Sequence, residues 1–441
     1  MPAPGLAAAM GASPEFVGRS GVVLERLHLL YPALIDLSLG RLQALLERLG
    51  HPERRLPPVI HVAGTNGKGS TCATLRAIAE AAGWRTHVTI SPHLVDITER
   101  YRIAGSLVSD TGLTAVLEEI ERVNDGGAIT VFEVLTAAGF LLFSRHPADL
   151  AIVEVGLGGR YDATNVLPTA AASVITAISM DHEAFLGDTI EAIAAEKAGI
   201  IRPGVPVVTG RQPDAVLAVL EQEAAHQGTR LLRRDRDWSV AAVPGGLRYE
   251  DAHGALALPP SALPGPHQVE NAGLAVAALR ASGLEVPSHA WGGIAATSWP
   301  ARLQRLNGRL ASSLPAGWEL WLDGGHNPGA GHALALALEA WRDRPLHLVV
   351  GMKQSKDVAG FLRPLLGLGH TIHAVAEPHQ HLALPVDAII EASGGRAVPG
   401  PTVAAALEAI ASAAPEPGRI LICGSLYLAG EVLKADGWRP E

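Results

Sequence analysis

The stretch that decides the fold is VIHVAGTNGKGST, residues 59–71. Residues 59–63 form a short apolar run typical of a buried parallel strand, and residues 70–83 show helical apolar spacing that ends at a glycine. The turn between them nearly matches the phosphate-loop pattern G-x-x-x-x-G-K-[ST], but Val62 stands at the outer glycine position and Gly69 at the hydroxyl position. A strand, a glycine-rich turn and a helix are the context that a phosphate loop requires. The stretch therefore predicts a nucleotide-binding site at the start of an α/β domain.

The chemistry of this turn suits an anionic ligand. Backbone N–H groups of a glycine-rich turn and of the following helix N-terminus attract phosphates. Three glycines allow the backbone to close around such a ligand without Cβ clashes: Gly64, Gly67 and Gly69. Lys68 would neutralise the β- and γ-phosphates, and Ser70 or Thr71 could reach Mg²⁺. The alternative is an ordinary strand-to-helix turn that carries an exposed lysine.

Composition limits the class of protein. A chain of 441 residues with 48% hydrophobic and 18% charged residues is globular and long enough for two or three domains at about 150 residues each. A net charge of −9 argues against a general nucleic-acid surface. Cys72 and Cys423 offer neither a disulfide framework nor a zinc spacing, which suits a reducing cytoplasm. No apolar run approaches the roughly 18–20 residues of a membrane helix, and residues 1–16 lack the pattern of a signal peptide. We expect a cytoplasmic protein that binds neither membranes nor nucleic acids.

The rest of the chain alternates between strand and helix patterns. Further strands are predicted in the first part at 84–91, 149–156, 172–179 and 205–210, and helices at 111–124, 130–146, 189–201 and 271–283. Helical spacing over 23–49 is interrupted at Pro32, and residues 237–260 read as a small antiparallel excursion. The pattern restarts after residue 298, with strands at 319–325, 346–351, 370–376 and 419–425.

Such alternation is typical of parallel sheets covered by helices on both faces. We predict a mostly parallel, P-loop-type α/β domain over residues 1–299. A smaller Rossmann-like α/β domain is predicted over residues 300–441.

Polar side chains follow several predicted strands at their carboxyl ends, where α/β sheets bind ligands. Glu154 ends one strand, and Asp181, His182 and Glu183 follow the next. Carboxylate oxygens are the ligands that Mg²⁺ prefers, and a neutral imidazole can also bind a divalent metal. The alternatives are an ion pair between Glu154 and Arg160, and a histidine with a purely structural role.

The second domain carries a polar group of its own. Asp323 ends a predicted strand, and His326 and Asn327 lie on the loop that follows. A loop that holds these residue types together more often binds a ligand than merely connects, although Asp and Asn also stabilise turns. Arg302 lies at the predicted hinge, from which it could reach a phosphate when the domains close.

Lysine is scarce, whereas arginine is common. It occurs only at Lys68, Lys197, Lys353, Lys356 and Lys434, so each has a slightly higher chance of being chemically required. Lys197 lies within a predicted helix, where an isolated lysine is ordinarily exposed to solvent.

Taken in order, these segments resemble the folylpolyglutamate synthase and dihydrofolate synthase family of the Mur ligase superfamily. The matching segments are IDLSLGRL, HVAGTNGKGST, SPHLVDITERYRI, VFEVLTAAGF, VEVGLGGRYDATN, ISMDHEAFLGDTIEAIAAEKAGI, HQVENAGLAVAAL, WPARLQ, LDGGHNP and GMKQSKD. In this family a glycine after the loop lysine is normal. Many members carry a hydroxyl directly before SPHL, a metal ligand in some, where this chain has Ile90. A ligand from that loop would then be Thr89, Ser91 or water, or would be absent. The chain also has PAR at 300–302 where PGR is commoner.

The resemblance implies a role for each matching residue. ATP would be bound by Gly64, Thr65, Asn66, Gly67, Lys68, Gly69, Ser70, Thr71, Asn271, Arg302 and Asp323. Metal ligands would be Ser70, Glu154 and His182, and residues near the pterin-bearing substrate would be Phe132, Glu133, Tyr161, Asp162 and Ala163. The catalytic group would comprise Lys68, Lys197, Asp323 and His326, with Lys197 N-carboxylated. The implied cofactors are ATP with one or two Mg²⁺ ions, and K⁺ is a further candidate.

The implied reaction is ATP-dependent amide formation through an acyl phosphate, in which L-glutamate is joined to dihydropteroate, to reduced folates, or to both. One alternative is a Mur ligase acting on a UDP-muramyl substrate, which should carry an additional N-terminal domain for which little room precedes the loop. Another is a P-loop switch without ligase activity, in which the polar residues Asp323, His326 and Asn327 of the second domain would have no purpose. We expect a monomer that acts on small molecules.

Overall fold

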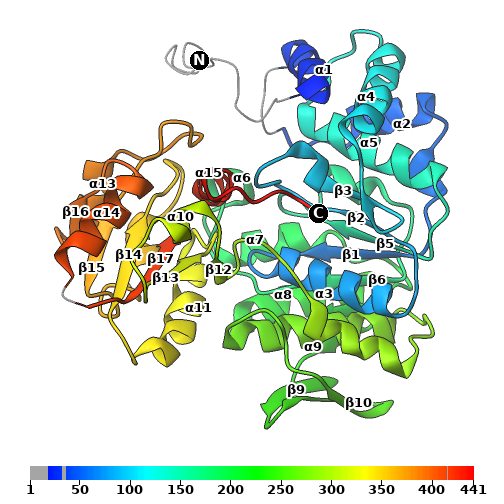
Figure 1. Ribbon diagram of the computed structural model, residues 1–441. Coiled ribbons are helices and arrows are strands. Elements are labelled where there is room, and N and C mark those ends of the chain that lie inside the picture. The colour runs from blue at the N-terminus through cyan, green and yellow to red at the C-terminus, as the bar shows by residue number, and fades with distance from the viewer. Residues whose placement is uncertain (1–17, 32–35, 415) are drawn as a thin grey trace.

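The computed structural model describes residues 18–31, 36–414 and 416–441. Two large sheets, each with its own helices, and a small third sheet make up the described part of the chain, which confirms the predicted α/β architecture (Figure 1). The predicted interruption at Pro32 and residues 1–16 lie outside the described residues. Among the described residues, no helix is both long and apolar enough to span a bilayer.

The first sheet has eight strands in the order β4-β3-β2-β5-β1-β6-β7-β8. Their bounds are β1 Val59–Ala63, β2 Thr86–Thr89, β3 Tyr101–Ile103, β4 Ser106–Leu107, β5 Leu150–Glu154, β6 Ala172–Ile175, β7 Val207–Thr209 and β8 Leu231–Arg233. Six strands run parallel, and β3 and β4 form an antiparallel edge. The edge strands and β8 have only two or three residues each, too few to show a period in the sequence.

Helices cover both faces of this sheet. They are α1 Gly18–Leu30, α2 Gly40–Arg48, α3 Lys68–Ala81, α4 Asp110–Asn124, α5 Val131–Arg145, α6 Glu183–Leu186, α7 Ile190–Ala198, α8 Asp214–His226 and α9 Pro266–Ala281. Alternate residues of β1 point to opposite faces, as strand geometry requires. Val59 packs in the cluster with α1, α2, α4 and α5, whereas Ile60 and Val62 pack in the cluster with α3 and α9.

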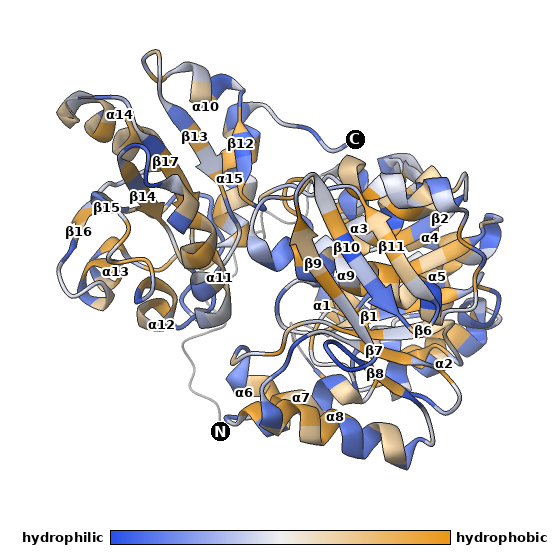
Figure 2. Cartoon of the chain, turned by 90° about the horizontal axis from the view of Figure 1, so that it is seen from below, coloured by the Kyte–Doolittle hydropathy of each residue, from blue (hydrophilic) through white to orange (hydrophobic). Residues whose placement is uncertain are grey.

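A three-stranded antiparallel sheet confirms the predicted excursion. It consists of β9 Trp238–Val243, β10 Gly246–Asp251 and β11 Gly254–Leu258. Figure 2 shows this sheet lying over α9, and Trp238, Val240 and Tyr249 join the same buried cluster as α3 and α9.

The second sheet has six strands in the order β12-β13-β17-β14-β15-β16. Its strands are β12 Gln304–Leu306, β13 Glu319–Leu322, β14 Leu346–Val350, β15 Thr371–Ala374, β16 Ala397–Pro399 and β17 Arg419–Cys423. Only β12 is antiparallel to its neighbour. The helices are α10 Arg309–Ser312, α11 Pro328–Leu338, α12 Val358–Leu362, α13 Val386–Ala392, α14 Val403–Ala413 and α15 Leu426–Asp436. Between the two sheets, the 3₁₀ segment η4, Ser288–Ala296, still packs on α3.

Candidate active site at the domain interface

The glycine-rich turn joins β1 to α3, as the sequence predicts. Gly64 and Gly67 have φ values of +144° and +92°, a backbone conformation that favours glycine. A Cβ on Gly64 would lie 1.9 Å from Thr176 Oγ1, and a Cβ on Gly67 would lie 2.5 Å from Asn271 Oδ1. Both glycines are therefore required by the tight approach of neighbouring side chains, and Asn271 of α9 borders the turn.

Gly69, the residue that breaks the usual loop pattern, has a different reason to be glycine. It lies within α3 at ordinary helical φ, yet a Cβ there would lie 2.6 Å from Trp299 Nε1. The missing side chain makes room for the Trp299 indole against the loop. Ser70 and Thr71 follow as buried residues, and the Thr71 hydroxyl has no hydrogen-bond partner among the described residues.

Two lysines from different elements converge on one main-chain carbonyl of the turn. Lys68 Nζ donates to Gly64 O at 3.1 Å and to Thr65 O at 3.4 Å, and Lys197 Nζ of α7 donates to Gly64 O at 3.0 Å. Lys197 is only 4% exposed. Its burial, with the nearby Lys68 charge, lowers the pKa of Lys197 to about 7. Lys197 is therefore not the exposed helix lysine that its local sequence suggests.

Glu154 ends β5 beside the turn and is buried. Burial raises the pKa of its carboxyl to about 6, against the opposing effect of Lys68. The Ser91 N–H donates to Glu154 Oε2 at 3.4 Å, and the Ser91 hydroxyl is buried without a partner among the described residues. Glu154 thus pairs with the loop that follows β2. Among the ion pairs of the described residues, Arg160 pairs with Glu223 at 3.2 Å and not with Glu154.

His182 lies at the N-terminus of α6 with φ 56°, and its Nε2 is 3.4 Å from Lys356 Nζ. Partial desolvation of the ring, which is still 41% exposed, and the Lys356 charge lower the pKa of His182 to about 4, so the imidazole is neutral at pH 7. Within the described part of the chain, no three His, Cys, Asp or Glu side chains are grouped so as to hold a metal ion. Glu154 and His182 therefore do not belong to one metal cage built from such side chains alone.

The loop after β13 brings the second domain to the turn. Asp323 is buried, and its carboxylate accepts hydrogen bonds from Leu303 N at 2.9 Å and Gly325 N at 2.7 Å. His326 Nδ1 lies 2.8 Å from Gly324 O, so Nδ1 carries the proton. Burial and the Lys356 charge lower the pKa of His326 to about 4. The loop therefore presents a neutral histidine beside a fixed carboxylate.

Direct side-chain contacts join the two domains at this point. Asn66 and Asn327 exchange two amide hydrogen bonds of 3.1 and 3.0 Å, and Asn327 also donates to Asp181 Oδ2 at 2.9 Å. Lys356 Nζ contacts Asp181 Oδ1 at 2.6 Å. Although burial alone would raise it, the Lys356 ammonium and the two neighbouring histidines hold the pKa of Asp181 well below its usual range. The nucleotide loop is thus tied to the second domain through Asn66.

Sequence reasoning did not assign roles to Asp181 or Lys356. The scarcity of lysine was the available signal for Lys356, and the position of Asp181 beside His182 was the signal for the carboxylate. Neither signal indicates that residues 175 positions apart form an ion pair.

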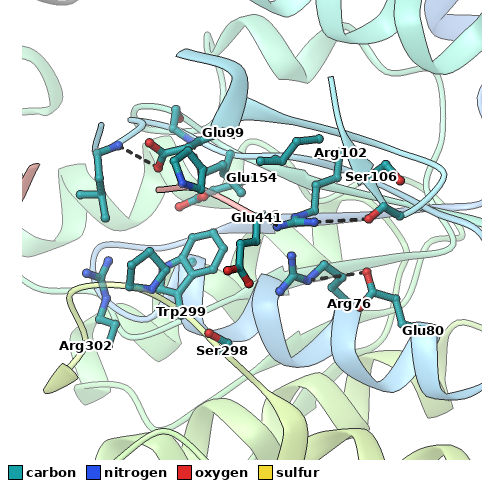
Figure 3. Close-up of a pocket in the computed structure, with 18 of the residues that line it drawn as sticks. Arg76, Glu80, Glu99, Arg102, Ser106, Glu154, Ser298, Trp299, Arg302 and Glu441 are labelled. Atoms are coloured by element: carbon teal, nitrogen blue, oxygen red, sulfur yellow. Dashed lines mark hydrogen bonds and ion pairs between the residues drawn. The ribbon is translucent and has the colours of Figure 1, made fainter. Parts of the chain in front are cut away.

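A cavity of about 740 Å³ lies beside the glycine-rich turn and the end of β5 (Figure 3). Gly69, Glu154, Trp299 and Arg302 line it, which places the predicted hinge arginine beside the predicted metal ligand. Ala301 has φ 54°, the left-handed region that favours glycine, which is the residue of the commoner PGR spelling.

The residues predicted near a pterin lie at the start of α5 and on the loop that follows β5. Phe132 and Glu133 begin α5, and a Cβ on Gly156 would lie 2.3 Å from Phe132 Cζ, so the ring packs on the strand-to-loop turn. Glu133 completes a capping box with Thr130 and forms an ion pair with Arg41 at 3.1 Å. Both contacts give Glu133 a structural role.

Tyr161, Asp162 and Ala163 follow on the loop after β5. Asp162 is buried and accepts hydrogen bonds from the Thr164 hydroxyl at 2.5 Å and from Leu157 N at 2.8 Å. Ala163 is buried, whereas Tyr161 is 48% exposed. Phe132 and Tyr161 thus supply aromatic surface, and Asp162 fixes the loop between them.

Comparison with known proteins gives a consistent family. A family model described as Mur ligase middle domain matches residues 62–279, and one described as dihydrofolate synthetase, C-terminal domain, matches residues 310–435. The dihydrofolate synthase/folylpolyglutamate synthase of Escherichia coli (strain K12) is 36% identical over 414 residues, covering 93% of this chain and 93% of that protein.

Comparison with solved structures gives the same family. The structure of E. coli FolC in complex with DHPP and ADP has a TM-score of 0.85 at 34% identity, covering 96% of this chain and 99% of that chain. The bifunctional folylpolyglutamate synthase/dihydrofolate synthase of Yersinia pestis complexed with AMPPNP and Mn ion has a TM-score of 0.85 at 33% identity, with the same coverage of 96% and 99%. The chain therefore belongs to the dihydrofolate synthase/folylpolyglutamate synthase family of ATP-dependent ligases, within the Mur ligase superfamily.

Proposed function

We propose that this ligase joins L-glutamate to dihydropteroate and to reduced folates at a single site, using ATP to activate the acceptor carboxylate. The observation that carries this proposal is the convergence of Lys68 and Lys197 on the Gly64 carbonyl, with Glu154 beside them. Asn66 and Asn327 connect this site to the loop of Asp323 and His326. A phosphate loop that is hydrogen-bonded to a polar loop of the second domain is suited to phosphoryl transfer from ATP to a second bound substrate.

The nucleotide would lie on the turn. Backbone N–H groups at the start of α3 and the Lys68 ammonium would bind the phosphates, with Lys68 at the γ-phosphate. Asn271 borders Gly67, and Arg302 and Asp323 come from the hinge and the second domain. These positions support their assignment as ATP contacts, together with Thr65, Ser70 and Thr71.

The residues present fit a magnesium ion. Mg²⁺ is typically held by one or two carboxylates together with phosphate oxygens and water. Glu154 supplies a buried carboxylate and Ser70 a hydroxyl, and the unpartnered hydroxyls of Ser91 and Thr71 are two further hard oxygen donors. When bound, Mg²⁺ offsets the negative charge of the transferred phosphoryl group. His182 is assigned to a second ion, and K⁺ stays an untested candidate.

We assign Lys197 as the site of N-carboxylation. An amine attacks CO₂ only in its neutral form, giving a carbamate and one released proton, and the pKa of about 7 leaves much of Lys197 neutral at physiological pH. The product is an anion that could orient a metal ion. Electron density at Nζ, or rescue of Lys197→Ala by a short carboxylate, supports the assignment; uncarboxylated density together with absent rescue contradicts it.

The reaction would proceed in two steps. The acceptor carboxylate attacks the γ-phosphorus and ADP leaves, and the amine of L-glutamate then attacks the acyl carbonyl and expels phosphate. Lys68 and Arg302 offset negative charge in the first step. The loop of Asp323 and His326 would help to exclude water, which otherwise hydrolyses the acyl phosphate. Phe132 and Tyr161 form the proposed surface for the pterin end, and the buried Glu133, Asp162 and Ala163 hold it in place.

We further propose that residues 1–299 and 300–441 act as two domains that close on the substrates, and that the enzyme works in the cytoplasm as a monomer. A UDP-muramyl ligase and a nucleotide switch are the rival functions. The family match disfavours both, since the relatives compared above are named for folate ligation.

The decisive experiment is a ligation assay. Purified protein with ATP, Mg²⁺, L-glutamate and dihydropteroate should release ADP and phosphate and form dihydrofolate, and a reduced folate should gain glutamate. Lys68→Ala should lower kcat by about 10³-fold or more, because a charge that acts on the phosphoryl group is lost. Lys434→Ala, which removes an exposed lysine paired with Glu431, is the matched control. No amide product from either acceptor would refute the proposal.

A further inference from the structure

The large cavity beside the turn contains a pair of arginines that the reaction described above does not use. Arg76 of α3 and Arg102 of β3 both line it, and Figure 3 shows them facing the same space as Trp299. Its volume of about 740 Å³ is that of a small-molecule site. The walls are apolar as well as charged, with Trp84, Ile90, Leu94, Trp299, Leu426 and Trp438.

The two arginines have donors that the described residues leave unused or engage only weakly. Arg76 is 13% exposed at its side chain, its Nε has no hydrogen-bond partner among the described residues, and its ion pair with the exposed Glu80 is long, at 3.8 Å. Arg102 donates to two main-chain carbonyls, Gly105 O at 3.3 Å and Glu441 O. Burial, with the repulsion from Arg76, lowers the pKa of Arg102 to about 10. Two half-buried guanidinium groups that repel each other are stabilised by an added anion.

The cavity leads from these arginines to the reacting centre. Gly69 and Glu154 line the same space, and Arg76 lies two helical turns beyond Gly69, about 10 Å along the axis of α3. A flexible chain with carboxylates at intervals can bridge that distance. The two acceptors of the proposed reaction differ in the number of carboxylates that they carry. Dihydropteroate offers only the carboxylate that reacts, whereas a glutamylated folate carries an α-carboxylate on every glutamate in addition to its reacting γ-carboxylate.

We propose that Arg76 and Arg102 bind the α-carboxylates of the acceptor's glutamyl tail, so that this cavity governs the use of glutamylated acceptors relative to dihydropteroate. The inference rests on the proposed function for the identity of the acceptor. The segment 438–441 borders the cavity and places the Glu441 carbonyl on Arg102, where it occupies a donor that a tail carboxylate would use. A bound tail therefore displaces this segment.

The kinetic test compares the two acceptors. Arg76→Gln and Arg102→Gln should each lower the ratio of kcat/KM for a triglutamylated reduced folate over kcat/KM for dihydropteroate by about ten-fold or more, because a charge-assisted hydrogen bond is lost. Arg85→Gln is the matched control, since Arg85 borders the cavity but faces Asp149 at 3.7 Å, and it should leave the ratio unchanged. Deletion of residues 439–441 should raise the ratio. An unchanged ratio in both arginine variants would overturn the proposal. So would a raised KM for free L-glutamate with an unchanged ratio, which would assign the cavity to the incoming amino acid.

A binding measurement separates this inference from the proposed function. Pteroyl-tri-γ-glutamate should bind the wild-type protein in calorimetry, and either arginine substitution should weaken it by about ten-fold or more, with Arg85→Gln unchanged. Circular dichroism and thermal melting confirm that the variants fold. If the wild type ligates neither acceptor but shows this arginine-dependent binding, the proposed reaction fails and the carboxylate site stands. If ligation occurs and binding does not depend on either arginine, the carboxylate site fails and the reaction stands.

Discussion

At the scale of single residues, burial decides what Lys197 can do. Its ammonium would have to remain charged at 4% exposure beside the positive charge of Lys68. Removing an ion from water is costly, so the folded protein favours the neutral amine. The same burial that makes Lys197 a poor cation makes it a suitable amine for carboxylation.

This burial predicts a pH-dependent stability. The pKa of Lys197 is about 7 in the folded protein and about 10.5 in the unfolded chain, so between these values the unfolded chain binds more protons. Stability linked to Lys197 therefore rises with pH across this window and is constant below it. Urea unfolding in CO₂-free buffer should show the free energy of wild type minus that of Lys197→Met increasing by about 1.4 kcal/mol per pH unit. A difference that stays flat between about pH 7 and 10 would show that the amine is not perturbed.

At the scale of elements, the start of α3 is adapted to the segment that follows η4. Trp299 occupies the space that a side chain on residue 69 would fill. The glycine after the loop lysine is thus explained by packing between a helix and the hinge, since Gly69 has no need for an unusual backbone conformation.

Gly69→Ala tests this explanation. The added Cβ must displace the indole, which should cost about 1–3 kcal/mol of stability and lower activity through movement of the cavity wall. Gly40→Ala, in the first turn of α2 with nothing within 4 Å of its Cβ position, is the matched control and should be neutral or slightly stabilising. Combining Gly69→Ala with Trp299→Ala should cost less than the sum of the two single changes. If Gly69→Ala changes stability and activity no more than Gly40→Ala does, the packing of Trp299 against residue 69 is not the reason for the glycine.

At the scale of the whole molecule, one buried carboxylate carries a central ion pair between the domains. Asp181 belongs to the first domain and its closest cation, Lys356, to the second, and both side chains are 9% exposed. Removing one partner of a buried pair leaves an uncompensated charge, at a cost of about 3–5 kcal/mol. Separation of the domains would relieve that cost by exposing Asp181 to water.

Lys356→Met combined with Asn327→Ala should therefore open the molecule. We expect a larger radius of gyration in small-angle X-ray scattering and a fall in kcat/KM of about ten-fold or more, because the loop of His326 leaves the turn. Lys353→Met is the control, since Lys353 lies over the Tyr427 ring at 4.8 Å within the second domain. An unchanged radius of gyration in the double variant would mean that other contacts hold the domains together.

The sequence alone was enough to predict the parallel α/β architecture, the glycine-rich turn and the small antiparallel sheet. These features depend on local patterns: five-residue strands with four apolar residues each in β1, β5 and β14, glycines after strands, and helical spacing in α3 and α4. Short edge strands such as β4 and β16 were not predicted, because two or three residues carry no period.

Only the tertiary structure decided what surrounds each charged group. The sequence places Lys197 in a helix, but the fold buries it against the turn, 133 residues earlier in the chain. Asn66 meets Asn327 across 261 residues, and Arg76 meets Arg102 in one cavity, because separate elements of the folded chain converge there. Burial and the distance to the nearest opposite charge set the pKa values of the site, and neither quantity is encoded in a local pattern.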